Sequence, residues 1–410
     1  MAAVLQNARL ALPLVLTYMI CALAGCSGSS TSSSGSGGHN NATATISVSS
    51  SSISFGQSVT LTWSSTNASS CTAGDDWSGA IALSGTQQVT PALPGPAVYS
   101  ITCGSATASA SLTIYQARGG SDYGWYQIDS PTCTREPYGV VFNYDTATDT
   151  INSQLKTMYA NGQHRLRIPI YHARGLATGT IMDSTGGTLA PRFLTNLTNL
   201  LAEIKALGFE EIEVSLNPQA QNQPAGWTSY SSDYFTENWG LIQTLHPIIA
   251  GAGIKYHIDL NNEGIPSDSA APMMEYAQNL WAAYVAKYGA GDTVGFSIIP
   301  DSTHLQQVSA VYGKNPVPPI FDLHFYDDAG TNFANAVTAL NGQGYKGMPW
   351  ILGEAYYNDA TEASQLRQQI DATGQPVYFL MQWPLTSAIA CQNVDVAPPI
   401  DFSNYITNHF

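Results

Sequence analysis

The feature that most constrains the fold is a repeat of eight apolar, strand-like runs in the C-terminal part of the chain. They cover residues 139–144, 166–171, 211–216, 254–260, 294–299, 320–326, 350–354 and 377–383. Stretches with the apolar spacing of helices lie between them, for example residues 193–207, 273–288 and 362–372. Eight strand–helix units in about 290 residues predict an α/β fold, a (β/α)8 barrel over residues 120–410. A doubly wound sheet is the alternative, but no GxGxxG or P-loop follows the first run.

Residues 43–117 have a different pattern, in which apolar and polar residues alternate in short runs with Gly, Pro and Asn between them. This period of two predicts a small all-β sandwich. The region resembles a bacterial immunoglobulin-like domain, although Trp63 precedes the first cysteine, so only the sandwich class carries over. Its role stays open between a carbohydrate- or cell-wall-binding module and a spacer.

The N-terminus has the features of an export signal. Arg9 precedes an apolar stretch over residues 10–24, which is too short for a comfortable transmembrane helix. The sequence Leu23-Ala24-Gly25-Cys26 resembles the bacterial lipoprotein signal, which implies cleavage after residue 25 and acylation of Cys26. An ordinary secretory signal is the alternative. Residues 26–42 are a Ser/Gly-rich tether.

These features predict a protein of the bacterial cell envelope, lipid-anchored at the outer membrane where the host has one, or secreted. Contact with a membrane is expected only through the lipid anchor. The formal charge of −15 leaves no basic surface for nucleic acid, and the 44% hydrophobic content excludes a disordered chain. We expect a monomer.

Four cysteines remain after Cys21 and Cys26 are set aside, which is an even number that suggests disulfides in an exported protein. Of the three possible pairings, the domain boundaries favour Cys71–Cys103 within the sandwich and Cys133–Cys391 across the seam of the barrel. No CxxC motif or Cys/His spacing fits zinc, so neither a metal nor a cofactor is expected.

The predicted chemistry lies at the C-terminal ends of the barrel strands, where barrel enzymes work. Glu263 follows the fourth run and Glu354 ends the seventh. Two carboxylates that face a common cavity are what cleavage of a glycosidic bond requires, because one protonates the leaving oxygen and the other attacks the anomeric carbon.

The region resembles clan A of the glycoside hydrolases, which includes the cellulase-like family five. Five motifs in the expected strand order carry the resemblance: Arg167-Ile168-Pro169, Asn262-Glu263, His324-Phe325-Tyr326, Glu354 and Trp383. Many members have proline after the acid, and here Gly264 stands there. The resemblance implies a retaining glycosidase that cleaves β-linked polysaccharide or oligosaccharide.

The resemblance also implies a role for each residue. Glu263 would be the general acid and base, with a raised pKa, and Glu354 the nucleophile, with their carboxyl groups roughly 5–5.5 Å apart. Arg167 and Tyr326 would keep Glu354 ionised. The expected substrate contacts are Asn262 at the 2-hydroxyl, His324 in the site wall, Trp383 stacked on the sugar and, from its polar loop, Trp227 as a sugar platform.

Two other readings remain. One is a carbohydrate-binding lipoprotein without activity on the same scaffold. The other is a metal-dependent hydrolase in which His257, Asp259, Asp322 and His324 converge. The first predicted strand lacks the His-x-His that barrel amidohydrolases use, which disfavours this second reading.

Overall fold

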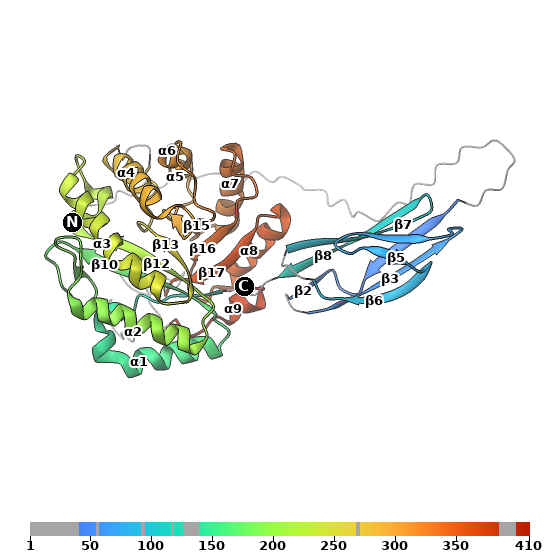
Figure 1. Ribbon diagram of the computed structural model, residues 1–410, viewed down its shortest axis with the longest axis horizontal. Helices are drawn as coiled ribbons and strands as arrows, with labels where there is room; N and C mark the ends of the chain where they lie inside the picture. Colours follow the sequence, from blue (N-terminus) through green and yellow to red (C-terminus); the bar gives the residue numbers. More distant parts are fainter. Residues whose placement is uncertain are drawn as a thin grey trace, which may run out of the picture. The chain divides into compact units, whose positions relative to one another are not determined.

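The chain is described by a computed structural model (Figure 1). The described residues are 41–54, 57–91, 95–115, 119–125, 139–267, 271–384 and 399–410. The predicted signal, Cys26, nearly all of the tether and the predicted Cys133–Cys391 disulfide lie outside them. Among the described residues, no helix is both long and apolar enough to cross a membrane.

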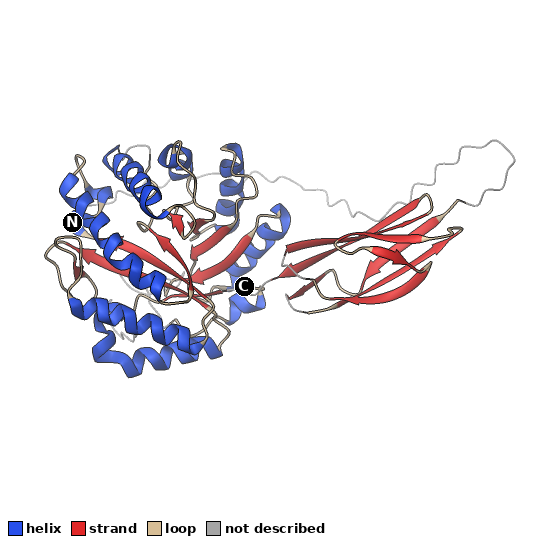
Figure 2. Cartoon of the chain, in the orientation of Figure 1, coloured by secondary structure: helices blue, strands red, loops and turns tan. Residues whose placement is uncertain are grey.

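The N-terminal part of the described chain consists of strands, drawn red in Figure 2. One sheet has the order β1 (Thr43–Val48), β3 (Val59–Thr66) and β6 (Ser84–Val89). The other has the order β2 (Ser52–Ser54), β8 (Ala106–Tyr115), β7 (Gly95–Cys103), β4 (Cys71–Asp75) and β5 (Gly79–Ile81).

Both sheets contribute to one hydrophobic cluster. Val59, Leu61 and Trp63 point into it from β3 because side chains on a strand alternate between its faces, and Ile101 and Leu112 join them from the second sheet. The two small sheets therefore share one hydrophobic cluster. The immunoglobulin-like assignment stays a prediction.

The Cys71–Cys103 disulfide confirms the predicted pairing. The two residues lie directly opposite each other on the antiparallel strands β4 and β7. They are 32 residues apart in the sequence. In the chain-entropy description, a loop of this length contributes about 3–4 kcal/mol by restricting the unfolded chain.

The C-terminal part is an eight-stranded parallel barrel that is nearly closed, which confirms the predicted (β/α)8 architecture. In chain order its strands are β9 (Gly119–Asp122), β10 (Arg165–Ala173), β12 (Glu211–Pro218), β13 (Lys255–Asp259), β14 (Thr293–Gly295), β15 (Phe321–His324), β16 (Trp350–Glu354) and β17 (Val377–Gln382). A short strand, β11 (Met182–Asp183), pairs with β10. The first and last strands of this sheet, β14 and β15, come together where Ile298 forms a parallel β-bridge with Leu323. The Ile298 amide donates to the Asp322 carbonyl at 2.9 Å, and the His324 amide donates to the Ile298 carbonyl at 3.1 Å.

Helices surround the barrel (Figure 2). The long ones are α1 (Val140–Ala160), α2 (Pro191–Leu207), α3 (Ser232–Gly251), α4 (Ala271–Tyr288), α7 (Ala329–Gly342) and α8 (Ala360–Thr373). The short ones are η1 (Ala220–Asn222), η2 (Pro224–Gly226), α5 (Ser302–Leu305), α6 (Val308–Tyr312) and α9 (Ser403–Thr407).

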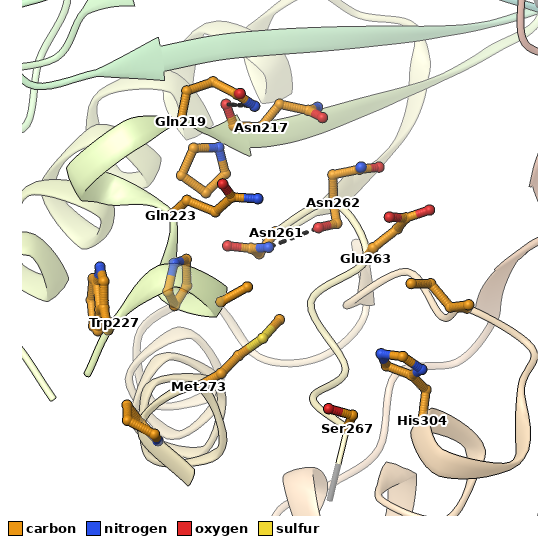
Figure 3. A pocket seen from close by; sticks show the side chains of 15 residues that line it. Asn217, Gln219, Gln223, Trp227, Asn261, Asn262, Glu263, Ser267, Met273 and His304 are labelled. Carbon is orange, nitrogen blue, oxygen red and sulfur yellow. Dashed lines mark hydrogen bonds between the residues drawn. The ribbon is translucent and has the colours of Figure 1, made fainter. Parts of the chain in front are cut away.

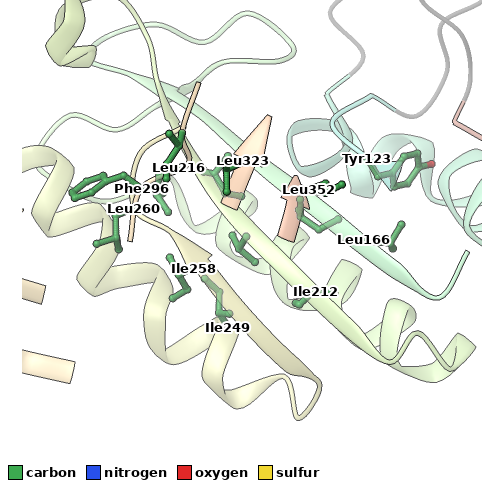
Figure 4. Packing of buried hydrophobic residues seen from close by; sticks show 14 of the residues in the cluster. Tyr123, Leu166, Ile212, Leu216, Ile249, Ile258, Leu260, Phe296, Leu323 and Leu352 are labelled. Carbon is green, nitrogen blue, oxygen red and sulfur yellow. The ribbon is translucent and has the colours of Figure 1, made fainter. Parts of the chain in front are cut away.

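The main hydrophobic cluster joins strands to helices. In Figure 4, Ile249 of α3 lies beside Ile258 of β13, and Ile212 of β12 lies in the same cluster. Helix α2 buries Leu197, Leu200, Leu201 and Ile204, which share one face at the spacing of three and four residues.

The first barrel strand was predicted wrongly. Residues 139–144 are not a strand, because they lead into α1, which buries Val140, Val141 and Tyr144 on one helical face. Short apolar runs do not separate buried strands from buried helices. The true first strand is β9, whose sequence Gly-Gly-Ser-Asp has no apolar side chain. Gly120 is required there, because a Cβ would lie 1.7 Å from the Arg165 carbonyl oxygen.

Candidate active site

A buried arginine organises the polar interior of the barrel. Arg167 on β10 is fully buried. Its guanidinium lies 2.8 Å from Asp122, 2.8 Å from Glu213, 3.0 Å from Asp259 and 2.7 Å from Glu354. The planar fork of donors suits several carboxylates at once, so this one side chain fixes the position of Glu354 relative to three other strands.

Glu354 ends β16 and is only 6% exposed. Arg167 Nη1 donates to its Oε1 at 2.7 Å, and the Tyr326 hydroxyl donates to its Oε2 at 2.7 Å. Burial and the negative charge of Glu354 raise the pKa of Tyr326 well above its usual range, so this tyrosine stays a donor. These two hydrogen bonds fix the orientation of the Glu354 carboxyl group.

Glu263 follows β13 in an unusual backbone conformation. Its φ is +50°, in the left-handed region that few non-glycine residues adopt. Its amide donates to Ser297 Oγ at 2.7 Å. The next residue is Gly264, where a Cβ would lie 2.6 Å from the Asn261 carbonyl oxygen, so no side chain fits. These contacts hold a strained segment of backbone at the predicted acid.

His324 connects the two glutamates. Its Nδ1 lies 3.3 Å from Glu263 Oε1 and 3.5 Å from Glu354 Oε2, and its Nε2 lies 3.3 Å from Asp322 Oδ2. Burial lowers the pKa of His324, but the charges of Glu354 and Asp322 outweigh it, so this pKa lies well above its usual range. His324 is therefore an imidazolium. One atom from each of Glu263, His324 and Glu354 lies within 4.8 Å of the others.

The predicted raised pKa of Glu263 is wrong for this structure. Burial raises the pKa of Glu263. The hydrogen bond and charge of His324, together with the charge of Arg167, lower it by more, so the net pKa lies below the usual value. The side chain is 36% exposed and lines an open pocket, so water reaches it.

Three other predicted contact residues lie around the two glutamates. Asn262 Oδ1 accepts from Arg167 Nη2 at 2.6 Å. Trp383 is half-buried and packs edge-to-face against Trp125, with ring centroids 4.8 Å apart. Trp227, on the loop after β12, lines the same pocket as Glu263.

A pocket of about 390 Å³ opens beside Glu263 (Figure 3). We call it the Glu263 pocket. Its walls come from the loops after β12, β13 and β14 and from the start of α4. Besides Glu263, its lining includes Asn217, Gln219, Gln223, Trp227, Asn261 and Met273.

The sequence analysis missed two buried carboxylates, Asp122 and Glu213, and it named the buried Asp259 and Asp322 only for the metal-dependent reading. Burial raises the pKa of Asp122 to about 7, and burial together with Asp322 raises the pKa of Glu213 well above its usual range. Burial also raises the pKa of Asp322, but the charges of His324 and Arg167 outweigh it, so this pKa lies below its usual value. A signal for Glu213 was present, because alternation in the run Glu211-Ile212-Glu213-Val214 places both glutamates on one face of the strand.

Two groups of described residues have metal-ligand spacing: Glu263 with His324 and Glu354, and Glu213 with Asp259 and Asp322. In the first group, His324 already contacts Glu263, Asp322 and Glu354. In the second group, Arg167 already donates to Glu213 and Asp259. His257 lies elsewhere, 2.9 Å from Glu211, so the four residues of the metal-dependent reading do not all converge.

We expect Ser297→Ala to impair the predicted acid, Glu263, more than the predicted nucleophile, Glu354, because Ser297 links the Glu263 amide to Asp259, whose Oδ2 accepts from Ser297 Oγ at 2.9 Å. A small displacement of a reacting group costs up to about 100-fold in rate. For β-glycosides, kcat/KM should fall by about 10- to 100-fold with poor leaving groups and much less with dinitrophenol.

The matched control is Ser215→Ala, which removes a buried serine that contacts Arg167 and Asp259 rather than Glu263. It should lower rates equally for all leaving groups. Equal losses in the Ser297 variant would contradict the link to Glu263.

No protein-family model matches the chain, and no curated protein matches it. Solved structures of glycoside hydrolase family 5 are similar to it. A GH5_18 enzyme from Streptomyces cattleya, in complex with GlcNAc, is 10% identical with a TM-score of 0.46, over 71% of this chain and 80% of that chain. A GH5 lichenase from Caldicellulosiruptor sp. F32 is 13% identical with a TM-score of 0.46, over 72% and 93%. An exo-β-1,4-mannosidase from Opitutaceae bacterium strain TAV5 is 15% identical with a TM-score of 0.42, over 65% and 51%. These are likenesses of the barrel fold.

Proposed function

We propose that this chain is a retaining glycoside hydrolase that cleaves β-glycosidic bonds in an extracellular polysaccharide or oligosaccharide. The supporting observation is the pair of carboxyl groups at the ends of β13 and β16, with oxygens within 4.8 Å of each other. Retaining glycosidases hold their two carboxyl groups roughly 5–5.5 Å apart, whereas inverting enzymes need about 6.5–9.5 Å to admit a water.

In the first step, Glu354 attacks the anomeric carbon while the bond from that carbon to the leaving oxygen breaks. Glu263 protonates the leaving oxygen. The nearest source of that proton is His324 Nδ1, 3.3 Å from Glu263 Oε1, and its transfer leaves a neutral imidazole beside Glu354. In the second step, Glu263 removes a proton from water, which attacks the anomeric carbon and releases Glu354. Glu263 then returns a proton to the neutral His324, which restores the starting enzyme.

We also propose that the enzyme works outside the cytoplasm, held to the cell envelope by a lipid on Cys26. The Cys71–Cys103 disulfide supports export, because such bonds persist in oxidising compartments. The sandwich region would then be a spacer or a second carbohydrate contact.

The first product should have the β configuration, because two displacements at the anomeric carbon restore the starting geometry. A panel of β-linked polysaccharides identifies the substrate, and proton NMR in the first minutes of hydrolysis reads the anomer before mutarotation. An α product first would mean inversion. Binding to a glycan without any hydrolysis would favour the non-catalytic alternative.

A further inference from the structure

The Glu263 pocket lies on the leaving-group side of the scissile bond. A general acid stands beside the oxygen that departs, and the nucleophile stands beneath the sugar ring that is retained. The lining of the pocket includes Glu263 but, among the described residues, none of Glu354, Tyr326 and Trp383. A ligand in this pocket therefore contacts the predicted acid, whereas the predicted nucleophile is not part of the pocket wall.

The lining of the pocket suits an uncharged, hydroxylated ligand. Glu263 and His304 are its only titratable members in the described part of the chain, and neither lysine nor arginine lines it. Side-chain amides dominate, from Asn217, Gln219 and Gln223. Amides both donate and accept hydrogen bonds, as sugar hydroxyl groups do.

One buried acceptor in the pocket lacks a partner. Asn261 is only 3% exposed, and its Nδ2 donates to the Asn262 carbonyl at 2.8 Å, which fixes the orientation of the amide. Its Oδ1 has no hydrogen-bond partner among the described residues. Figure 3 shows this oxygen on the side away from Asn262, toward Gln223 and Trp227. An unpaired buried acceptor is destabilising, and this oxygen is itself shielded from solvent in the free chain.

Trp227 also lines a second pocket. The second pocket, which we call the outer pocket, has a volume of about 540 Å³. Its lining includes Trp227, Thr228, Tyr230, Ser231, Asp233 and Tyr234. Both volumes fall in the range of roughly 300–1,000 Å³ that is typical of ligand sites.

The indole of Trp227 is held in place before any ligand arrives. Its Nε1 donates to the Gln221 carbonyl at 2.8 Å. Tyr276 meets the ring edge-to-face with centroids 5.4 Å apart, and Tyr234 lies 5.9 Å away. A fixed aromatic surface binds a ligand without a further loss of side-chain entropy, and the apolar face of a pyranose ring stacks on such a surface.

We infer that the Glu263 pocket and the outer pocket form one groove for the leaving group, with one sugar residue on each side of Trp227. The inference rests on the proposed function and deepens it. The groove is a site for a neutral oligosaccharide of at least two residues beyond the cleaved bond. The cleaved bond therefore has at least two sugar residues on its leaving-group side, and substrates with longer leaving groups are hydrolysed better.

The test compares β-1,4-linked tetrasaccharides of glucose and of mannose with the β-fluorides of the corresponding disaccharides. Fluoride is too small to enter the groove and needs no proton.

The wild type should cut the better tetrasaccharide mainly into two disaccharides. Trp227→Ala should lower the ratio of kcat/KM between tetrasaccharide and fluoride by about 10- to 100-fold, the range measured for loss of one large aromatic contact. In the Trp227→Ala variant, cleavage of the tetrasaccharide should shift toward release of the terminal monosaccharide. Mass spectrometry of a tetrasaccharide with an 18O-labelled reducing end shows which bond was cleaved.

Further variants distinguish an effect on binding in the groove from a general loss of folding or activity. Trp227→Phe keeps a ring and should restore part of the ratio, and Gln223→Ala, at an exposed position in the Glu263 pocket, should lower the ratio without touching the packing of Trp227. The matched control is Tyr378→Ala, a 44% exposed aromatic near the opposite end of β17, which should change nothing. Turnover of both substrates with an unchanged ratio in the Trp227 and Gln223 variants would overturn the groove alone. No turnover by the wild type of these substrates or of any glycan in the panel would overturn the proposed function.

Discussion

Glu354→Gln should lower kcat by about 10⁴- to 10⁶-fold for every leaving group, the scale on which loss of a covalent nucleophile acts. An amide cannot form the glycosyl ester, and no leaving group compensates for that. The fold should survive, because the amide keeps the shape of the carboxylate. The Tyr326 hydroxyl can turn to accept from the new amide nitrogen, while Arg167 keeps its oxygen acceptor.

The matched control is Glu362→Gln, which also replaces a buried glutamate of the barrel. Burial raises the pKa of Glu362 to about 8, so its carboxyl group is already largely neutral at pH 7. The control should keep full activity. Thermal unfolding followed by circular dichroism should show both variants folded, so that the loss in Glu354→Gln reflects chemistry rather than stability.

A 2-deoxy-2-fluoro glycoside with a dinitrophenyl leaving group checks the covalent step directly. The wild type should gain the mass of one sugar on the peptide that contains Glu354, and the Gln variant should gain none. A label on another residue, or a variant that retains a tenth of the activity, would contradict the assignment of Glu354 as nucleophile.

The parts of the site that the sequence predicted share one property. Asn262, Glu263, His324 and Glu354 follow or end apolar runs that form barrel strands, so their place in the fold follows from the position of the run. Asp122 was missed for the opposite reason. It ends a strand whose other residues are Gly119, Gly120 and Ser121, where close backbone packing replaces apolar side chains and no periodicity remains.

The electrostatics of the site could not be predicted from the chain in the same way. The expected pKa of Glu263 followed from its chemical role, whereas the actual shift depends on the distance from Glu263 to His324, which lies 61 residues away in the sequence. The charge on His324 depends in turn on Asp322 and Glu354. Such mutual dependence arises only after the barrel brings strands β13, β15 and β16 together.

Glu263→Ala should fail in a different way from Glu354→Gln. Without the acid, rates should fall by about 10²- to 10⁴-fold with poor leaving groups such as sugars and far less with dinitrophenol, which departs without a proton. With the activated substrate, the variant should form the glycosyl-enzyme quickly and then stall, because no base remains to activate water. Stopped-flow absorbance should show a burst of dinitrophenol release followed by a slow steady state.

Added azide should restart the stalled variant. The Glu263 side chain is 36% exposed and lines the Glu263 pocket, so its removal leaves a space that a small anion can enter from water. His324 and Arg167, which lower the pKa of Glu263 by favouring a negative charge there, would favour azide in the same place. Azide needs no base, and it reaches the anomeric carbon from the face opposite Glu354, so the product should be the β-glycosyl azide.

The control is Glu354→Ala with the same substrate and azide. There the anion would occupy the position of the nucleophile and give the α-glycosyl azide, or no product. Carbon and proton NMR distinguish the two anomers. An α-azide from Glu263→Ala together with a β-azide from Glu354→Ala would exchange the two roles, and rescue of neither variant would contradict both. The anomer is decisive because it reports which face of the sugar each glutamate occupies, independently of how much activity survives.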